Sequence, residues 1–464
     1  MPLHTIASIV RTERYGWQAS RRVHRVLSIW RPPHHAGSAR RSILARPAAG
    51  DLRTAVLWVL AVVPQAFGFW LVAGDVAGVQ PGQTRTFVLA AMLTLGLATL
   101  AQVVVGYRLT LYEGPAAAYL AAVVVVAAGG HGLAAIGAGL LVGGATVALL
   151  GVLRFDRLLL RVFTPLTGMV FVLVVTVAVL PTTVARALAT SHVHPWGTTA
   201  GWVAALAVVA VGVGLQRPRV TRPYALLVAL LVGAAAAIAV GGVPHADLSG
   251  GLALPSALPW GAPQFSVQVI VPFVIAAGLI AFNTVAAVEV GSAMQEVEKA
   301  RLASARGLVV HGAVQAVGAL AGNVLGTVAR LDSVPIVQLL GNRRRTALAI
   351  AALLVMALAL VQPFLGLVAA LPLTVSAALL ALMFCSMIVQ TLQRLWPLGA
   401  HARMVAAVAL APSIAWTPLQ HLLSPTAKLL GNPMLWGVAA GLVLERVLER
   451  RTGRAPATAL AERA

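Results

Sequence analysis

The fold is decided by one short stretch, Gly326-Thr-Val-Ala-Arg-Leu-Asp-Ser-Val-Pro-Ile-Val-Gln-Leu-Leu-Gly341. It stands where the hydropathy pattern requires a membrane helix, but Asp332 and Pro335 interrupt it. A helix needs about 20 apolar residues to cross a bilayer, so this segment is too short to span. The pattern predicts a helix that is broken within the membrane.

The rest of the chain has the composition of an integral membrane protein. Of its 464 residues, 59% are hydrophobic and 10% are charged, and the mean hydropathy is +0.89. Soluble proteins carry about 25% charged residues. The net charge of +21 does not indicate nucleic-acid binding, because the basic residues lie in tails and in short loops between apolar spans. The lone Cys385 excludes a disulfide framework.

Apolar segments of membrane-helix character recur along the whole chain, and the third and tenth of them are short. They are 54–73, 86–105, 115–129, 132–152, 163–181, 199–215, 223–241, 268–291, 308–322, 333–340, 346–361, 372–390, 403–416 and 431–446. We therefore predict an all-α polytopic membrane protein with about 14 transmembrane segments.

The basic residues fix the expected orientation. Cytoplasmic loops of membrane proteins are rich in Lys and Arg. With fourteen spans and a cytoplasmic N-terminus, 30 of the 34 Lys and Arg residues (34 − 4) fall on the cytoplasmic side. The four exceptions are Arg85, Arg186, Arg330 and Lys428. Both termini are predicted to be cytoplasmic, in the cell (plasma or inner) membrane.

Two tails flank the predicted transporter domain of residues 51–446. Residues 1–50 are rich in Arg and Pro, and we predict a disordered cytoplasmic tail that lies on anionic lipid. The alternative is an extension without function. Residues 447–464 form a second cytoplasmic tail.

The broken segments occupy corresponding positions in two halves of seven spans. The third carries Leu111-Tyr-Glu-Gly-Pro-Ala-Ala-Ala-Tyr119, and two spans after each break comes a Pro-Leu-Thr, at Pro165 and at Pro372. An odd number of spans per repeat gives the halves opposite orientations. Paired interrupted segments mark the binding site of many transporters, because half-helix ends expose backbone groups to a solute. The plain alternative is that Gly and Pro only kink ordinary helices.

Three polar side chains are expected near the membrane interior. Ionisable residues at this depth are costly and usually face a cavity. Asp332, in the tenth segment, is the first candidate for a group that gains and loses a proton. Glu289 is the second, although it lies near the end of its span and is equally explained as an interface residue. Asn283 lies in the same helix, about 9 Å from Glu289 and toward the helix N-terminus. Its amide can both donate and accept hydrogen bonds.

Several motifs between about 268 and 395 resemble the nucleobase–cation symporter 2 family (nucleobase–ascorbate transporters), which includes bacterial uracil and xanthine permeases. They are the polar eighth span, Arg306-Gly-Leu-Val-Val-His311-Gly312, Gly322 to Gly326-Thr327, the broken tenth span, and Leu371-Pro372. Weaker matches come earlier, at Pro64-Gln65, Gly114 to Tyr119 and Pro165 to Gly168.

The resemblance implies a 7+7 inverted repeat with core and gate domains. The core would hold 54–152 and 268–361, and the gate 163–241 and 372–446. The third and tenth segments would each supply a short strand and a half-helix. It further implies a homodimer that carries uracil or a purine such as xanthine together with a proton or a sodium ion.

The site residues follow from aligning these motifs. The acid that binds the base in the eighth span of the family falls at Asn283, and the tenth-span acid falls at Asp332. We expect Asn283 and the backbone of Ala116, Ala117, Leu331 and Asp332 to hold the base, with Ser333 beside them and Tyr119 stacking on it. Asp332 would be the proton-coupling group and Glu289 the reserve.

The sequence thus predicts a secondary active transporter that imports a nucleobase by proton or sodium symport through alternating access. One alternative is an anion carrier resembling the sulfate-permease family, which Arg330 favours and Asp332 opposes. Another is a membrane sensor or scaffold that transports nothing. An enzyme, a cofactor and a metal site are not expected, since His192 and His194 lack a third ligand and His245 and His311 are isolated.

Overall fold

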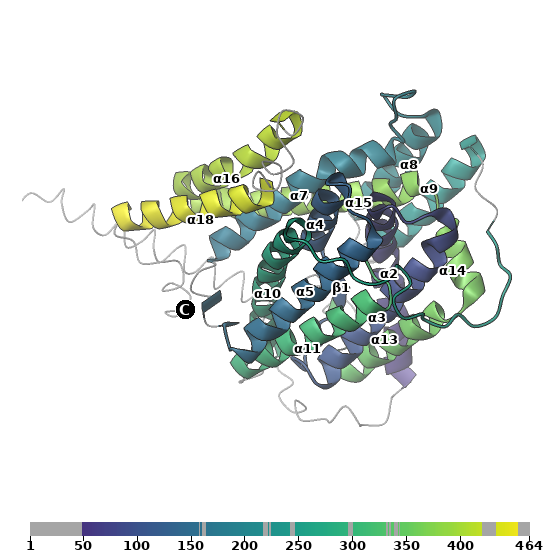
Figure 1. Ribbon diagram of the computed structural model, residues 1–464, viewed down its shortest axis with the longest axis horizontal. Helices are drawn as coiled ribbons and strands as arrows, with labels where there is room; N and C mark the ends of the chain where they lie inside the picture. Colours follow the sequence, from purple (N-terminus) through teal and green to yellow (C-terminus); the bar gives the residue numbers. More distant parts are fainter. Residues whose placement is uncertain are drawn as a thin grey trace, which may run out of the picture.

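A computed structural model describes residues 49–156, 158–159, 164–216, 221, 224–241, 246–295, 300–330, 333, 336–337, 342, 344–419 and 433–452. Over these residues the chain is mostly helical (Figure 1). Leu331, Asp332 and most of the predicted tenth segment lie outside them, as do the residues of both predicted tails, except for short helix ends.

Helices occur at each of the other predicted segments. Those of the first half are α2 (Ala49–Ala77), α3 (Thr84–Val104), α4 (Ala117–Ala128), α5 (Leu133–Val152), α7 (Pro165–Ala187), α8 (Thr199–Gln216) and α9 (Ala225–Gly241). Those of the second half are α10 (Val267–Gln295), α11 (Ala300–Leu320), α13 (Arg345–Ala359), α15 (Leu373–Leu395), α16 (Ala400–Leu419) and α18 (Pro433–Thr452). The short helix α14 (Gln362–Ala369) was not predicted and lies between two predicted segments. The described residues also include two short 3₁₀ turns, η1 (Pro81–Gln83) and η3 (Trp396–Leu398).

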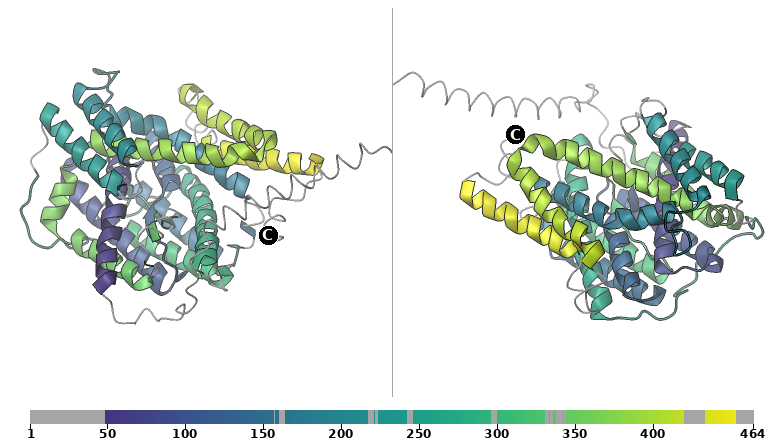
Figure 2. Two further views of the ribbon diagram at one scale, coloured as in Figure 1. Left: turned by 180° about the vertical axis from the view of Figure 1, so that it is seen from behind. Right: turned by 90° about the horizontal axis from the view of Figure 1, so that it is seen from above.

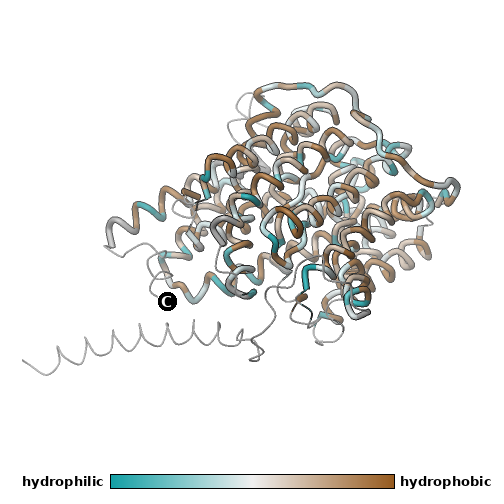
Figure 3. The backbone as a smooth tube through the Cα atoms, turned by 90° about the horizontal axis from the view of Figure 1, so that it is seen from below, coloured by the Kyte–Doolittle hydropathy of each residue, from teal (hydrophilic) through white to brown (hydrophobic). Residues whose placement is uncertain are grey.

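The length and apolarity of these helices suit a bilayer. Within the described residues, seven are long and apolar enough to cross it, namely α2, α3, α5, α7, α8, α10 and α15, and shorter apolar helices include α4, α9 and α13. Hydrophobic residues run along most of the helices in Figure 3. Large apolar side chains such as Leu206, Leu231 and Ile414 are exposed on the outside, where acyl chains would cover them. The protein is a multi-pass membrane protein, and the total of fourteen segments stays a prediction.

One small sheet joins the two halves of the chain. Strand β1 (Glu113–Pro115) pairs antiparallel with β2 (Thr327–Ala329), with Gly114 opposite Val328. The pairing continues on both sides, since Ala116 N–H donates to Gly326 O (2.9 Å) and Arg330 N–H donates to Tyr112 O (3.0 Å). Helix α4 starts directly after β1, and the predicted tenth segment starts directly after β2. The two breaks therefore meet in space.

Helices from both halves pack around this sheet. Helix α5 packs on α11, α3 on α13, and α10 on α5, α4 and β2. The first of these contacts is very close, because a Cβ added to Gly312 would lie 2.3 Å from Gly144 O. Small residues allow membrane helices to approach in this way.

The remaining helices form a second group. Helix α8 packs on α9 and α16 packs on α18, while α7 and α15 pack on each other. Each pair also contacts α7 or α15. Figures 1 and 2 place α16, α18 and α7 on one side of the molecule and α3, α11 and α13 on the other.

The loop between α9 and α10 is described from residue 246 and lies across the ends of α3, α11 and α14. Trp260 Nε1 donates to Gly322 O (2.9 Å), and Arg85 Nη2 lies 2.9 Å from Asp247 Oδ2. Hydrogen bonds from Ser249, and then the charge of Arg85, lower the pKa of Asp247. These contacts fix the loop to the same helices that surround the sheet.

Candidate functional site

The crossing of the two breaks depends on two glycines. A Cβ on Gly326 would lie 2.2 Å from Tyr119 Cδ2 and 2.4 Å from Gln315 Nε2. A Cβ on Gly114 would lie 2.7 Å from Arg330 Cγ. Real Cβ atoms do not approach other atoms so closely, so only glycine allows the two chain segments to pass each other here.

The start of α4 offers backbone groups at this crossing. Ala116 is the extended N-cap residue (φ −98°, ψ 114°), and the first hydrogen bond within the turn joins Leu120 N–H to Ala116 O (3.1 Å). The first amides of any helix have no partner within it. Ala116 is buried and its amide is engaged by Gly326, whereas Ala117 is half-buried at the open helix start. Of the two predicted contacts, the amide of Ala117 is thus the better placed.

Helix α10 carries the predicted side chains Asn283 and Glu289 past the crossing. It packs on both α4 and β2. Asn283 is half-buried, and its neighbour Phe282 lies against Gly168 of α7, where a Cβ would be 2.9 Å from the ring. Asn283 therefore sits near the junction of the two helix groups. Glu289 is also half-buried and lies further toward the end of the helix.

Tyr119 and Ser333 have structural positions in this conformation. The Tyr119 ring is fully buried, 5.8 Å from the ring of Phe273. Stacking on a substrate needs an exposed ring face, so this position does not support the role expected for Tyr119. The buried Ser333 hydroxyl accepts from Tyr112 N–H (3.1 Å) and donates to Arg330 O (2.6 Å), which fixes the start of the tenth segment to the strand before α4.

Two predicted residues, Leu331 and Asp332, lie outside the described residues. Their neighbours place the chain on either side: Arg330 is half-buried with its aliphatic part over Gly114, and Ser333 is fully buried. The structure thus brings together Ala116, Ala117, Ser333 and the helix of Asn283.

Sequence reasoning missed a buried acid–histidine pair behind β1. Glu113, in the third segment, has a fully buried side chain, and its Oε2 lies 3.2 Å from Nδ1 of His311 in α11. His311, expected to be isolated, therefore has an acidic neighbour. The signal available in the sequence was the presence of both ionisable residues within apolar segments, which is costly without a partner.

A second buried acid was also missed. Glu445 of α18 is 3% exposed and accepts hydrogen bonds from the hydroxyls of Thr164 and Thr167 at the start of α7. The Thr164 hydroxyl also accepts from Thr167 N–H (3.1 Å) and so caps the helix. This acid joins two helices of the second group.

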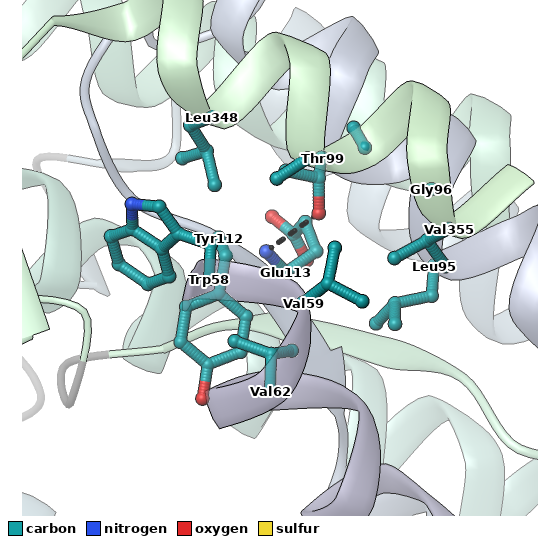
Figure 4. A pocket seen from close by; sticks show the side chains of 12 residues that line it. Trp58, Val59, Val62, Leu95, Gly96, Thr99, Tyr112, Glu113, Leu348 and Val355 are labelled. Atoms are coloured by element: carbon teal, nitrogen blue, oxygen red, sulfur yellow. Dashed lines mark hydrogen bonds between the residues drawn. The ribbon is translucent and has the colours of Figure 1, made fainter. Parts of the chain in front are cut away.

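A small cavity lies beside the start of β1, between α2, α3 and α13 (Figure 4). Its lining includes Trp58, Leu95, Thr99, Tyr112, Glu113 and Val355. Its volume of about 20 Å³ has room for about one water molecule, which is too little for a nucleobase. None of the predicted substrate residues lines it, so it is not the predicted site. Within the described residues, no cluster of three or more His, Cys, Asp or Glu side chains could hold a metal ion.

Apolar spanning helices, interrupted where two halves of the chain cross, define a membrane transporter. The profile of the permease family (Xan_ur_permease) matches residues 55–411. The chain therefore belongs to this family, that of the nucleobase–ascorbate transporters, as the sequence motifs indicated. No curated protein matches the sequence.

Solved structures share the fold. The transmembrane domain of a cyanobacterium bicarbonate transporter, BicA, superposes with a TM-score of 0.62 at 17% identity, covering 85% of this chain and 96% of that one. The murine anion transporter Slc26a9, in an inward-facing state, superposes with a TM-score of 0.59 at 14% identity, covering 93% and 75%. At these identities the likeness concerns the fold alone.

Proposed function

We propose that this permease is a secondary active transporter that imports a nucleobase, uracil or a purine such as xanthine, by proton or sodium symport. The observation that carries the proposal is the pairing of β1 with β2. It joins the strand before α4 to the strand before the predicted tenth segment, beside α10, which carries Asn283. Half-helix ends in such a place bind small polar solutes with backbone groups. Membership of the permease family supports the nucleobase as substrate.

The helix contacts support the proposed inverted repeat of seven plus seven segments. In this numbering α2, α3, α4, α5, α7, α8 and α9 are segments one to seven. Segments eight and nine are α10 and α11, segments eleven to fourteen are α13, α15, α16 and α18, and the predicted tenth segment lies between α11 and α13 in the chain. The contact of α2 with α13 is then matched by that of α10 with α5, and the contact of α8 with α9 by that of α16 with α18. Exchanging the two halves maps each contact onto the other.

The same contacts support a division into core and gate. The proposed core comprises 54–152 and 268–361 and includes the crossing. The proposed gate comprises 163–241 and 372–446. Alternating access then follows from motion of one group against the other around a site near the midplane. We further propose a homodimer in the cell membrane with both termini in the cytoplasm, on the basis of the family and the charge pattern.

The proposed substrate contacts are the Asn283 amide and the backbone at Ala117, Leu331 and Asp332. The amide offers a donor and an acceptor, as the edge of a nucleobase requires. Asp332 is the proposed proton-coupling acid, and Glu289 is the second candidate. Both assignments rest on sequence position.

Ligand binding tests the substrate class. Purified protein in detergent would be heated with uracil, xanthine, hypoxanthine, sulfate or bicarbonate while its melting temperature is recorded. A ligand that binds only the folded protein raises its stability, by about 2.7 kcal/mol at 100 times its Kd. We expect one or more nucleobases to raise the Tm and the anions to leave it unchanged. A rise with bicarbonate or sulfate alone would reject the nucleobase proposal.

Asp332→Asn tests the coupling acid. We expect the variant to fold, with a Tm near that of the unchanged protein, and to lose pH-driven uptake, because an amide cannot take up a proton in this range. Uptake of radiolabelled base into proteoliposomes, with and without an inward proton gradient, is the measurement. Full pH-dependent uptake by this variant would remove Asp332 from the mechanism.

An anion carrier is the second candidate function. The half-buried Arg330 follows β2 directly and lies against Gly114 at the crossing, so it brings positive charge beside the start of α4. Helix N-termini and Arg side chains both favour anions. Among the ligands above, binding of bicarbonate or sulfate that is lost in Arg330→Gln would establish this function instead.

A further inference from the structure

We propose that Glu113 and His311 form a buried proton-binding site that is linked to transport. This inference rests on the proposed function as a proton-coupled carrier and adds a site to it. The ligand is a single proton, shared by the carboxylate and the imidazole. The two residues lie in different halves of the chain and meet only in the folded protein.

The pair is buried within the protein. Both side chains have no exposed surface, and Nδ1 of His311 lies 3.2 Å from Oε2 of Glu113. Tyr107 donates its hydroxyl to Oε1 of Glu113 (3.3 Å) and to the carbonyl of Leu111 (3.0 Å). In the described part of the chain, neither Oε2 nor either ring nitrogen of His311 has a partner that is aligned for a hydrogen bond.

Burial determines how many protons the pair holds. A carboxylate beside a neutral imidazole leaves one uncompensated negative charge in a dry site, which is strongly unfavourable. One added proton, on Oε2 or on Nδ1, makes the pair neutral overall, either as two neutral groups or as an ion pair. A second proton would leave one uncompensated positive charge. In this buried conformation the favoured state therefore has no net charge, with one proton shared by the pair.

The polar groups around the pair are hydroxyls that have their own hydrogen-bond partners. From the chain before β1, Tyr107 faces Glu113, while Tyr112 accepts a hydrogen bond from Gln65 of α2 (2.8 Å). Helix α3 contributes Thr99, whose hydroxyl accepts from Glu113 N–H (3.1 Å), as Figure 4 shows. A neighbouring cation among the described residues is Arg330, whose side chain lies across Gly114.

The pair is mechanically tied to the proposed substrate site. Glu113 is the first residue of β1, and Ala117, a proposed substrate contact, begins α4 four residues later. His311 lies on α11, four residues before Gln315, which accepts from Thr327 N–H of β2 (3.0 Å). A change of charge at the pair thus acts on both strands of the crossing. The small cavity beside Glu113 and Thr99 has room for about one water, which could carry the proton.

The test measures protons and substrate separately. Purified protein in weakly buffered detergent with a pH-indicator dye would be mixed with whichever nucleobase raises its Tm. We expect the number of protons exchanged with the solution per bound base to be smaller by about one in Glu113→Gln than in the unchanged protein, because Asp332 still contributes in the variant, and base exchange between the two sides of a proteoliposome should be retained. His311→Asn should lower this number in the same way. Asp247→Asn, an acid-to-amide change in an exposed loop, is the matched control and should keep it.

Two outcomes would overturn the proposal. One is wild-type proton uptake and pH-driven accumulation in both Glu113→Gln and His311→Asn. If Glu113→Gln fails to fold, His311→Asn decides alone. The second outcome concerns the case in which the unchanged protein binds no nucleobase and the proposed function itself fails. Infrared spectra of the ligand-free protein across a pH titration then test the site directly, and an absence of any carboxyl band that Glu113→Gln or His311→Asn alters would reject it.

Discussion

Single residues at the crossing determine whether the two broken segments can meet. Gly326 has an ordinary backbone conformation, so its requirement is steric. The ring of Tyr119 and the amide of Gln315 occupy the space where a side chain would begin. Both are held in place, by Phe273 and by Thr327 respectively.

Gly326→Ala is therefore expected to destabilise the protein by about 1–3 kcal/mol, as overpacking a tight site does. The same displacement would separate β1 from β2, so base uptake should fall as well. The measurements are the Tm in detergent and uptake into proteoliposomes. Gly137→Ala in α5 is the matched control, because its Cβ would meet nothing within 4 Å. Equal Tm values for the two variants would contradict the explanation that a side chain at position 326 clashes with Tyr119 and Gln315.

The residues of the site also differ in how far the sequence revealed them. Asn283 could be proposed from its place in an apolar span, because hydropathy is a local property. The partnership of Glu113 with His311 could not, since it joins positions far apart in the chain. The burial of Tyr119 was likewise invisible, because an aromatic residue beside a break can point into the core or into the site.

At the scale of elements, the start of α7 depends on α18. Thr164 caps α7, and Glu445 accepts hydrogen bonds from both Thr164 and Thr167. A carboxylate beside a helix N-terminus is favoured by the helix dipole. The Thr-Pro-Leu-Thr motif is thus completed by an acid from the far end of the chain.

Glu445→Ala is expected to cost about 1–3 kcal/mol, because two buried hydroxyls lose their acceptor. Glu445→Gln should cost less, since an amide can still accept from one hydroxyl. Melting temperatures of these variants and of the double variant with Thr167→Val would measure the interaction, and the two changes should be less than additive. Val447→Ala, at an exposed position on the same helix, is the control. An unchanged Tm in Glu445→Ala would show that the hydrogen bonds do not matter to stability.

The elements themselves followed closely from the sequence. Each described helix that corresponds to a predicted segment lies at the predicted place, since a span of apolar residues must form a helix to satisfy its backbone in lipid. The strands were expected only from the family resemblance. A strand of three residues leaves almost no signal in hydropathy, and it exists here because its partner is available.

At the scale of the whole molecule, an ion pair joins the proposed core to the proposed gate. Asp75, near the end of α2, pairs with Arg186, near the end of α7. Both side chains are partly exposed, so the pair adds little to stability. Its position is informative, because motion of gate against core would change the distance between these two residues.

Cross-linking tests this motion. In a Cys385→Ser background, Asp75→Cys with Arg186→Cys would be joined by a short thiol-reactive linker, and we expect uptake to stop and to return when a cleavable linker is cut. Arg85→Cys with Asp247→Cys is the control, since that pair joins α3 to the loop that leads into α10 and should tolerate the link. Undiminished uptake after complete linking of 75 to 186 would contradict the proposed gate motion.

The sequence by itself determined the membrane class, the places of the spans, the two interruptions and the family, because hydropathy, charge and short motifs are written in neighbouring residues. Only the tertiary structure decided that β1 pairs with β2, that Glu113 is buried against His311, and that Glu445 completes the start of α7. Each of these is a contact between segments that are distant in the chain. Such contacts form because the packed fold excludes water from polar groups, which must then find their partners in the protein.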